Sequence, residues 1–327
     1  MKTISPYQAA ALMLCFSLSR LISFKPSGDN LLICAAGELL AGAALAAVSV
    51  ALPEKLSIKG RLIPKLCAAL SAAYLLLQLT LLLSDLAAST QYSFPDFYAS
   101  PAMIASAAAA AAYCASMGKG GCGRAACAVI VITLIIFVLT AVGAADRFDP
   151  DRLSLAVPDR AQQLSRQLLY SLGTACEIPL ALILRQSTDR PRRAALLWFS
   201  GHSLSWAAML TLCAGVIGDH ALTGIPIDTL SSYSKTSVIE RFDALLLLVW
   251  VLCTVLAAAA LLSGTGCCIK IISDKAGRFA PPIGALISGA AACLLTGQGV
   301  LLPASVMAAL LGGAMLLGFG AKEVRGC

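Results

Sequence analysis

The sequence has few charged residues, and this shortage excludes most classes of soluble protein. Only 13% of its 327 residues are charged, whereas 59% are hydrophobic, and the mean hydropathy is +0.85. Soluble domains contain roughly 25% charged residues. A chain this apolar cannot cover its own surface in water, so a disordered, nucleic-acid-binding or small disulfide-linked secreted protein is excluded. The composition indicates a polytopic membrane protein.

The sequence also lacks the short motifs of common catalytic and metal sites. It contains no Walker loop, no GxGxxG or HExxH sequence and no nucleophile–base pair, so we do not expect an enzyme. None of its 13 cysteines belongs to a CxxC pair, and most lie in apolar stretches, where cysteine packs as a small hydrophobic residue. We therefore expect neither a metal site nor a cofactor.

Apolar runs bounded by charged residues, proline and glycine predict an all-α integral membrane protein with about ten transmembrane helices. Only helices or closed barrels satisfy the backbone in lipid, and the alternation typical of a barrel is absent. The first run is interpreted as a span and not as a cleaved signal peptide. The expected spans are about 7–24, 30–52, 66–88, 100–117, 126–145, 163–184, 194–217, 242–263, 280–297 and 300–320.

The positive charges indicate which side of the membrane faces the cytoplasm. With the amino terminus inside, about two thirds of the 24 Lys and Arg residues fall in the inner segments. This distribution predicts that both termini are cytoplasmic. The net charge of +7 is then a result of topology and does not indicate a nucleic-acid partner.

Ten spans divide into two sets of five. Because each set has an odd number of spans, the halves would insert in opposite orientations, as in transporters with inverted repeats. We expect a single domain over 1–327, with repeat 1 at about 7–145 and repeat 2 at about 163–320. This plan predicts that the first helix of each half, span 1 and span 6, is broken near the middle of the membrane.

Span 6 contains LLYSLGTACEIPLALIL, which places polar and helix-breaking residues inside an apolar stretch. Pro179 would free backbone carbonyls, and Gly173 is a poor helix former. At helical spacing, Glu177 and Thr174 would share one face with Gly173 and Tyr170. We expect a loosened segment that holds a cation or a substrate ammonium group. The alternative is a proline kink in which a protonated Glu177 bonds to a neighbouring helix.

A second acidic residue, Glu38, lies deep in span 2 between Gly37 and Gly42, which allow neighbouring helices to approach closely. Glu38 could be a proton or ligand partner. It could also pair with Arg20 near the outer end of span 1, and we favour this pair. Span 1 contributes Ser17 but has no Gly or Pro to support its interruption.

Spans 3 and 8 add polar residues to a site expected between spans 1, 3, 6 and 8. Tyr74 and Gln78 form one polar stripe on span 3, and Thr254 lies in span 8. Such hydroxyls are also easily buried when they bond to their own helix. If a ligand site exists, Glu177 would face an ammonium group. Thr174 and the carbonyls near Gly173 would then supply hydrogen bonds, with Tyr74 and Thr254 as walls.

Three stretches together resemble the spore germination permeases. The sequence has ISPYQ directly before span 1, CEIPLAL in span 6 and SVIERFDALLLLVWVL at the start of span 8. These are similar to an IS-x-x-Q start and an (I/F)ER–apolar–IW segment in this family, which belongs to the amino acid–polyamine–organocation superfamily. Glu240, Arg241 and Trp250 match the span 8 signature, and Glu177 matches the acidic position of span 6.

The resemblance implies a LeuT-like helical fold and the role of the membrane B subunit of a nutrient germinant receptor. This role implies the inner membrane of an endospore, an A subunit and a lipoprotein C subunit as partners, and an amino acid or similar small nutrient as ligand. The alternative is an amino acid permease coupled to H⁺ or Na⁺. A third possibility is a structural subunit without a ligand.

Overall fold

The computed structural model describes residues 4–26, 30–51, 62–93, 100–153, 159–173, 177–185, 187–218, 225–234 and 242–296. Apart from one isolated β-bridge, the regular structure in these ranges is helical. The α-helices are α1 (Pro6–Ile22), α2 (Leu31–Ala51), α3 (Leu62–Ser93), α4 (Ser100–Ser116), α5 (Gly118–Ala144), α6 (Arg160–Gly173), α7 (Glu177–Arg185), α8 (Pro191–Ile217), α9 (Pro226–Tyr233), α10 (Phe242–Ile272) and α11 (Asp274–Thr296).

The chain is an integral membrane protein by the length and composition of its helices. Within the described residues, five helices are long and apolar enough to cross a membrane. They are Leu31–Ala51, Ala68–Thr90, Gly118–Arg147, Pro191–Ile217 and Phe242–Ile272, and two shorter apolar helices cover Pro101–Ser116 and Phe279–Leu295. The tenth expected span, at 300–320, lies outside the described residues, so the count of ten stays a prediction.

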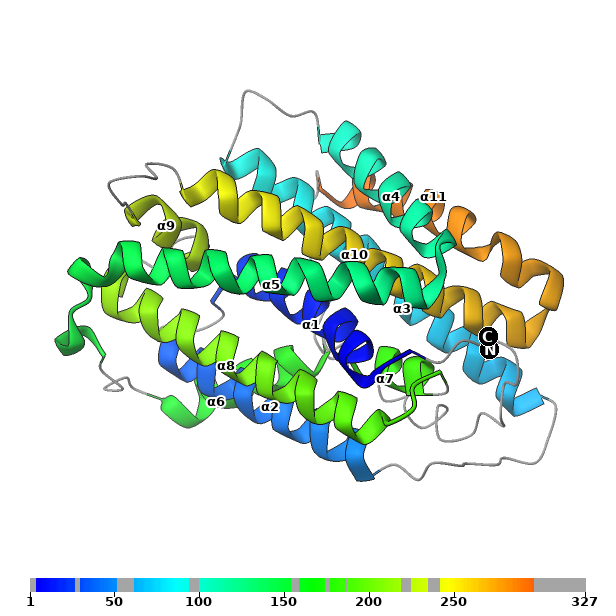
Figure 1. Cartoon of the computed structure of the whole chain (residues 1–327), viewed down its shortest axis with the longest axis horizontal. Coiled ribbons are helices and arrows are strands. Elements are labelled where there is room, and N and C mark those ends of the chain that lie inside the picture. The colour runs from blue at the N-terminus through cyan, green and yellow to red at the C-terminus, as the bar shows by residue number, and fades with distance from the viewer. Residues whose placement is uncertain are drawn as a thin grey trace.

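The helices pack in two groups with α1 between them (Figure 1). In one group α10 is central and packs against α3, α4, α5 and α11. In the other group α2 packs against α8 and α6. Because α1 contacts both α10 and α8, its side chains are enclosed along most of the helix. Polar residues on α1 can therefore contact helices of both groups.

Helices that occupy corresponding places in the two expected halves pack against each other. The contacting pairs are α1 with α7, α2 with α8, α3 with α10, and α4 with α11. We count α6 and α7 together as span 6 and the short α9 as a loop helix. Each contacting pair then joins a span of the first half to the span five places later in the chain. Helices from the two halves are therefore interleaved within one bundle.

The expected break in span 1 is wrong, because α1 is continuous from Pro6 to Ile22. A reciprocal capping box fixes its start. The Gln8 N–H donates to Ser5 Oγ at 3.3 Å, and the Ser5 N–H donates to Gln8 Oε1 at 3.1 Å. After Pro6 the helix contains neither Gly nor Pro, so no local feature interrupts its hydrogen-bond ladder.

Span 6 consists of two helices. α6 ends at Gly173 and α7 begins at Glu177. Pro179 therefore lies in the first turn of α7, where its missing N–H removes no intrahelical hydrogen bond, and it does not kink a longer helix. The expectation that Glu177 shares a helix face with Tyr170 and Gly173 is wrong, because Glu177 starts a separate helix. Thr174 lies outside the described residues.

Candidate functional site

Glu177 is a buried carboxylate at the start of a short helix. It is the first residue of α7, and only 2% of its surface is exposed. Ser17 Oγ donates to Glu177 Oε1 at 2.8 Å, and Arg20 Nη1 lies 3.9 Å from the same oxygen. Within the described residues, Oε2 has no hydrogen-bond partner. The amino end of a helix favours negative charge, so this second oxygen can receive a donor from a ligand.

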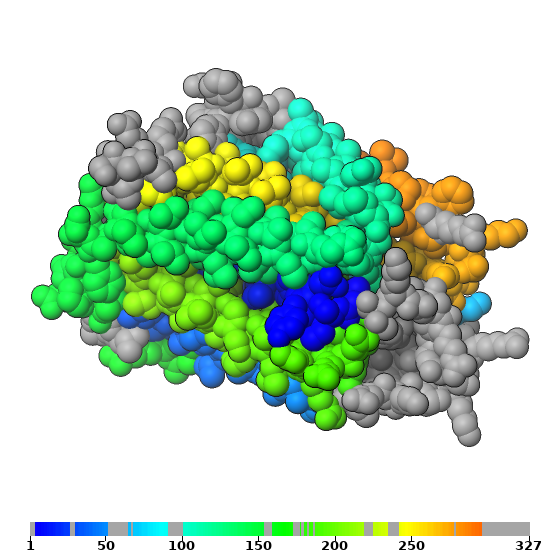
Figure 2. Space-filling view, viewed as in Figure 1, coloured from blue at the N-terminus to red at the C-terminus, as the bar shows by residue number. Residues whose placement is uncertain are grey.

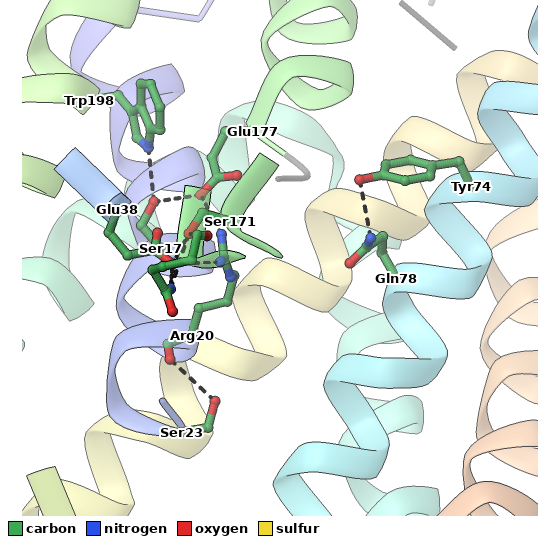
Figure 3. A network of polar contacts seen from close by, with 10 residues as sticks. Ser17, Arg20, Ser23, Glu38, Tyr74, Gln78, Ser171, Glu177 and Trp198 are labelled. Atoms are coloured by element: carbon green, nitrogen blue, oxygen red, sulfur yellow. Dashed lines mark hydrogen bonds and ion pairs between the residues drawn. The ribbon is translucent and has the colours of Figure 1, made fainter. Parts of the chain in front are cut away.

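The Ser17 hydroxyl connects three helices. Ser17 on α1 accepts a hydrogen bond from Trp198 Nε1 on α8 at 2.9 Å, while it donates to Glu177 on α7 (Figure 3). The Ser17 hydroxyl therefore acts both as a donor, to Glu177, and as an acceptor, from Trp198. The position of Glu177 consequently depends on how α1 packs against α8.

Glu38 forms the second centre of the same network. Its Oε1 lies 3.3 Å from Arg20 Nη2, so the pair expected from the sequence is present. The same oxygen accepts from Ser171 Oγ at 2.5 Å and from Gln167 Nε2 at 3.1 Å, both on α6. Glu38 is 1% exposed, and its charge is therefore compensated by hydrogen bonds as well as by Arg20.

Close packing of α2 brings Glu38 to these partners. A Cβ atom at Gly37 would lie 2.7 Å from Gln167 Cγ, and one at Gly42 would lie 2.9 Å from His202 Cδ2. The predicted role of these two glycines is thereby confirmed: Gly37 allows α2 to approach α6, and Gly42 allows it to approach α8.

The network carries more negative than positive charge when both acids are ionised. In the described part of the chain, two carboxylates, Glu38 and Glu177, share the guanidinium of Arg20. An uncompensated charge inside the membrane is costly. The arrangement therefore favours one additional positive charge near Glu177, supplied by a proton, a monovalent metal ion or an ammonium group.

Tyr74 and Gln78 form a polar pair on α3. Both are buried, and Gln78 Nε2 donates to Tyr74 Oη at 3.1 Å. In Figure 3 both side chains extend from α3 toward the helices that carry Glu177 and Arg20. The pair therefore lies on the side of α3 that is turned toward the candidate site, and its role as a wall stays a prediction.

Thr254 and Ser19 join α10 to α1. Their hydroxyl oxygens are 2.6 Å apart, and both side chains are buried. Thr254 thus bonds to α1 directly. Trp250, one turn earlier on α10, is also buried, and its Nε1 has no hydrogen-bond partner among the residues described.

The structure brings four of the predicted site residues together in one network, and others lie outside the described ranges. Glu177, Ser17, Arg20 and Glu38 form one network, and Gly173 ends the helix that carries two of the partners of Glu38. The residues predicted from the sequence that lie outside the described ranges are Thr174, Glu240 and Arg241.

Sequence reasoning missed three members of the network: Gln167, Ser171 and Trp198. Gln167 and Ser171 are four residues apart on α6, and this spacing in the polar start of span 6 was an available signal. No signal pointed to Trp198, because an indole in an apolar span is typical of ordinary packing. Within the described residues, no group of three or more His, Cys, Asp or Glu side chains is placed to hold a metal ion.

The comparisons with known proteins identify the fold. No family model matches the chain, and no curated protein matches it. Its structure is similar to that of Mhp1, a nucleobase-cation-symport-1 family transporter, solved in a closed conformation with bromovinylhydantoin bound. The TM-score is 0.56 at 15% sequence identity, and the similarity covers 97% of this chain and 78% of that one. The chain has a LeuT-like fold. At this level of identity the similarity concerns the fold alone.

Proposed function

We propose that the chain is a permease-type membrane protein that binds a small nutrient through a protonated amine. The observation that carries this proposal is Glu177 Oε2, a buried oxygen without a hydrogen-bond partner in the described structure, beside an excess of negative charge. An ammonium group supplies both the missing donor and the missing charge.

The geometry favours a primary amine over a guanidinium group. A guanidinium binds a carboxylate best through two parallel hydrogen bonds, which require both oxygens. Oε1 of Glu177 already accepts from Ser17, so one oxygen is available to a ligand. An amino acid with a free α-amino group satisfies this requirement.

We propose that the protein senses this nutrient as the membrane B subunit of a germinant receptor. It would lie in the spore inner membrane with both termini cytoplasmic, and an A subunit and a lipoprotein C subunit would be its partners. The sequence stretches before span 1 and in spans 6 and 8 support this role. The second candidate is an amino acid permease coupled to H⁺ or Na⁺, and the similarity in fold to a cation-symport transporter supports it.

We further propose that the fold is a five-plus-five inverted repeat whose tenth span lies at 300–320. The packing of α1, α2, α3 and α4 against α7, α8, α10 and α11 supports this plan. The division of span 6 at Gly173 and Glu177 supports it in the second repeat.

Binding is tested with purified full-length protein in detergent and each common amino acid in carbon-14 form. The wild type should bind at least one of them, and Glu177→Gln should weaken that binding by about tenfold or more, because it removes a charged acceptor. Asp274→Asn is the control, since Asp274 is 74% exposed at the start of α11. Failure of the wild type to bind any amino acid would overturn the proposal.

Flux separates the two candidate roles. The amino acid that binds is offered to proteoliposomes under an inward Na⁺ or H⁺ gradient. Binding without accumulation supports the receptor subunit. Accumulation that requires the gradient supports the permease and rules out a protein that only senses.

A further inference from the structure

His202 is a buried histidine whose two ring nitrogens have no hydrogen-bond partner among the described residues. It lies on α8, and only 2% of its surface is exposed. A buried polar atom without a partner needs an explanation, and in most buried histidines a hydrogen bond at one nitrogen decides which of the two carries the proton. No such contact is made by His202. Its second nitrogen is therefore available to bind a proton from solution.

Two indole rings flank His202 along α8. The ring centroid of Trp198 lies 5.4 Å from that of the imidazole, and the ring centroid of Trp206 lies 5.7 Å from it. The interplanar angles are 34° and 40°, so both indole faces are turned partly toward the imidazole. An indole face attracts a cation that lies within about 6 Å of its centre. The two faces therefore stabilise an imidazolium at this position more than they stabilise a neutral ring.

The packing around the imidazole is close. A Cβ atom at Gly42 on α2 would lie 3.0 Å from His202 Nε2, so the backbone of α2 closes that edge of the ring. Phe24 packs edge-on against Trp206, with ring centroids 5.2 Å apart. In Figure 2, α5 and α8 cover most of α1, and only the start of α1 reaches the surface. At the Nε2 edge this packing leaves room for a proton but not for a metal ion or an ammonium group.

Charged groups act on the ring from the two helices that pack against this part of α8. Arg20 on α1 acts on His202 through its positive charge, and the backbone of Glu38 on α2 lies close to the ring. After Arg193, α8 itself has no other charged side chain. Burial and the charge of Arg20 oppose an imidazolium, whereas the indole faces and the carboxylates of the network favour it. Protonation of the ring therefore depends on the negative charge of the network.

We infer that His202 is a proton-binding site that is linked to the amine site at Glu177. Trp198 lies against His202 and donates to Ser17. Ser17 in turn donates to Glu177 (Figure 3). In the described structure the network has two carboxylates for one guanidinium, and a proton on His202 balances the remaining negative charge. The inference rests on the proposed function, because it names the charge that the network holds while the amine is absent.

Proton binding at His202 and amine binding at Glu177 oppose each other. An ammonium group at Glu177 supplies the same positive charge, so it removes the negative potential that holds the proton on the imidazole. The proton then leaves for the solvent. Linkage requires the reverse effect by the same factor, so a proton on His202 weakens amine binding. The affinity for the amine therefore falls on acidification, over the pH range in which His202 takes up its proton.

The proton site is tested by NMR without any ligand. The sequence has two histidines, so His220→Gln leaves His202 as the source of every histidine signal. Full-length protein with this change and nitrogen-15 in its imidazole ring is titrated in detergent micelles from about pH 8 to about pH 5, the range in which histidine changes charge. We expect the ring shifts of an imidazolium to replace those of a neutral imidazole. A ring that stays neutral throughout this range would overturn the inference.

The link to the amine site is tested in the same protein. Glu177→Gln removes a negative charge that favours the imidazolium, so the ratio of imidazolium to imidazole at a fixed pH should fall by about threefold to tenfold. Asp274→Asn is the control, because it removes an exposed carboxylate and should leave the ratio unchanged. Equal ratios in these two proteins would mean that His202 is not linked to Glu177 and would also overturn the inference.

The indole rings are tested with a matched pair of tryptophan variants. Trp206→Leu removes one of the two faces, and the ratio of imidazolium to imidazole should fall by about twofold to fivefold. Trp250→Leu removes a buried indole on α10 and should leave the ratio unchanged. Equal effects of the two changes would contradict the site. Because amino acids are absent from these titrations, their results stand even if the binding experiment fails.

Discussion

Ser17 and Glu177 are 160 positions apart in the sequence, and the hydroxyl of one donates to the carboxylate of the other at 2.8 Å. Trp198 completes the arrangement by donating to the same hydroxyl. Three helices from the two halves of the chain therefore meet at one oxygen atom. This junction explains how a buried carboxylate is held in position while its second oxygen has no hydrogen-bond partner among the described residues.

Ser17→Ala should lower the free energy of unfolding by about 1–3 kcal/mol. The change leaves the Trp198 N–H without its acceptor and Glu177 Oε1 without its hydroxyl donor, and buried polar groups that lose a partner are costly. Chemical denaturation of the protein in detergent micelles, followed by tryptophan fluorescence, measures the loss.

Ser203→Ala is the matched control for this change. Its hydroxyl is buried on α8 and has no hydrogen-bond partner in the described structure. Removing that hydroxyl should leave the free energy of unfolding unchanged or raise it slightly. Equal losses in the two variants would show that the Ser17 bridge does not contribute to stability.

The acids of the site could be predicted from the sequence because a carboxylate in an apolar span is costly and needs a reason. This argument identified Glu38 and Glu177, and the flanking glycines identified the close approach of α2. The spacing of Gln167 and Ser171 marks a polar face of α6, but the contact of that face with Glu38 could not be predicted, nor could the contact of Trp198 with Ser17. Both contacts depend on which faces of distant helices meet.

The break in span 1 shows how an argument from the fold can mislead. The inverted-repeat plan required an interruption in α1, yet the local sequence after Pro6 offered no Gly or Pro to form one. In span 6 the plan and the local residues agreed, and that span is indeed two helices. Local helix chemistry was the better guide at both positions.

The Arg20–Glu38 pair should behave as a coupled unit. Arg20→Gln should lower the free energy of unfolding by about 3–5 kcal/mol, since it leaves two buried carboxylates without their shared counterion. Glu38→Gln should cost less, because Arg20 keeps Glu177 at 3.9 Å. The double variant should lose less than the sum, by about 1–2 kcal/mol. A double-mutant cycle by chemical denaturation measures this difference.

The exposed pair of Lys270 and Asp274 provides a reference for the energy of an ion pair at the surface. Its atoms are 3.9 Å apart and its carboxylate is 74% exposed, so Asp274→Asn should cost less than about 1 kcal/mol. Strict additivity of Arg20→Gln and Glu38→Gln would mean that the two side chains do not interact in the folded protein.

Gly37→Ala should destabilise the packing of α2 against α6. The added Cβ would lie 2.7 Å from Gln167 Cγ, and Gln167 is fully buried, so the helices must separate. The expected cost is about 1–3 kcal/mol. Gly120→Ala is the comparison, because its nearest neighbour would be Arg124 Nη1 at 3.9 Å, and alanine favours the helix by about 1 kcal/mol. If both alanines raise the thermal midpoint, close packing at Gly37 is not required.

Thr254→Val should destabilise the protein more than the same change at a threonine that bonds only to its own helix. Valine keeps the shape of the side chain but removes the hydroxyl that meets Ser19 at 2.6 Å, so Ser19 on α1 loses a buried partner. We expect the free energy of unfolding to fall by about 1–2 kcal/mol.

Thr265 lies on the same helix, is equally buried, and donates to the Leu261 carbonyl at 2.9 Å. Thr265→Val should therefore change stability by less than about 0.5 kcal/mol, because that carbonyl lies within the hydrogen-bond ladder of α10. Parallel denaturation curves measure both, and equal effects would contradict the contact between α10 and α1.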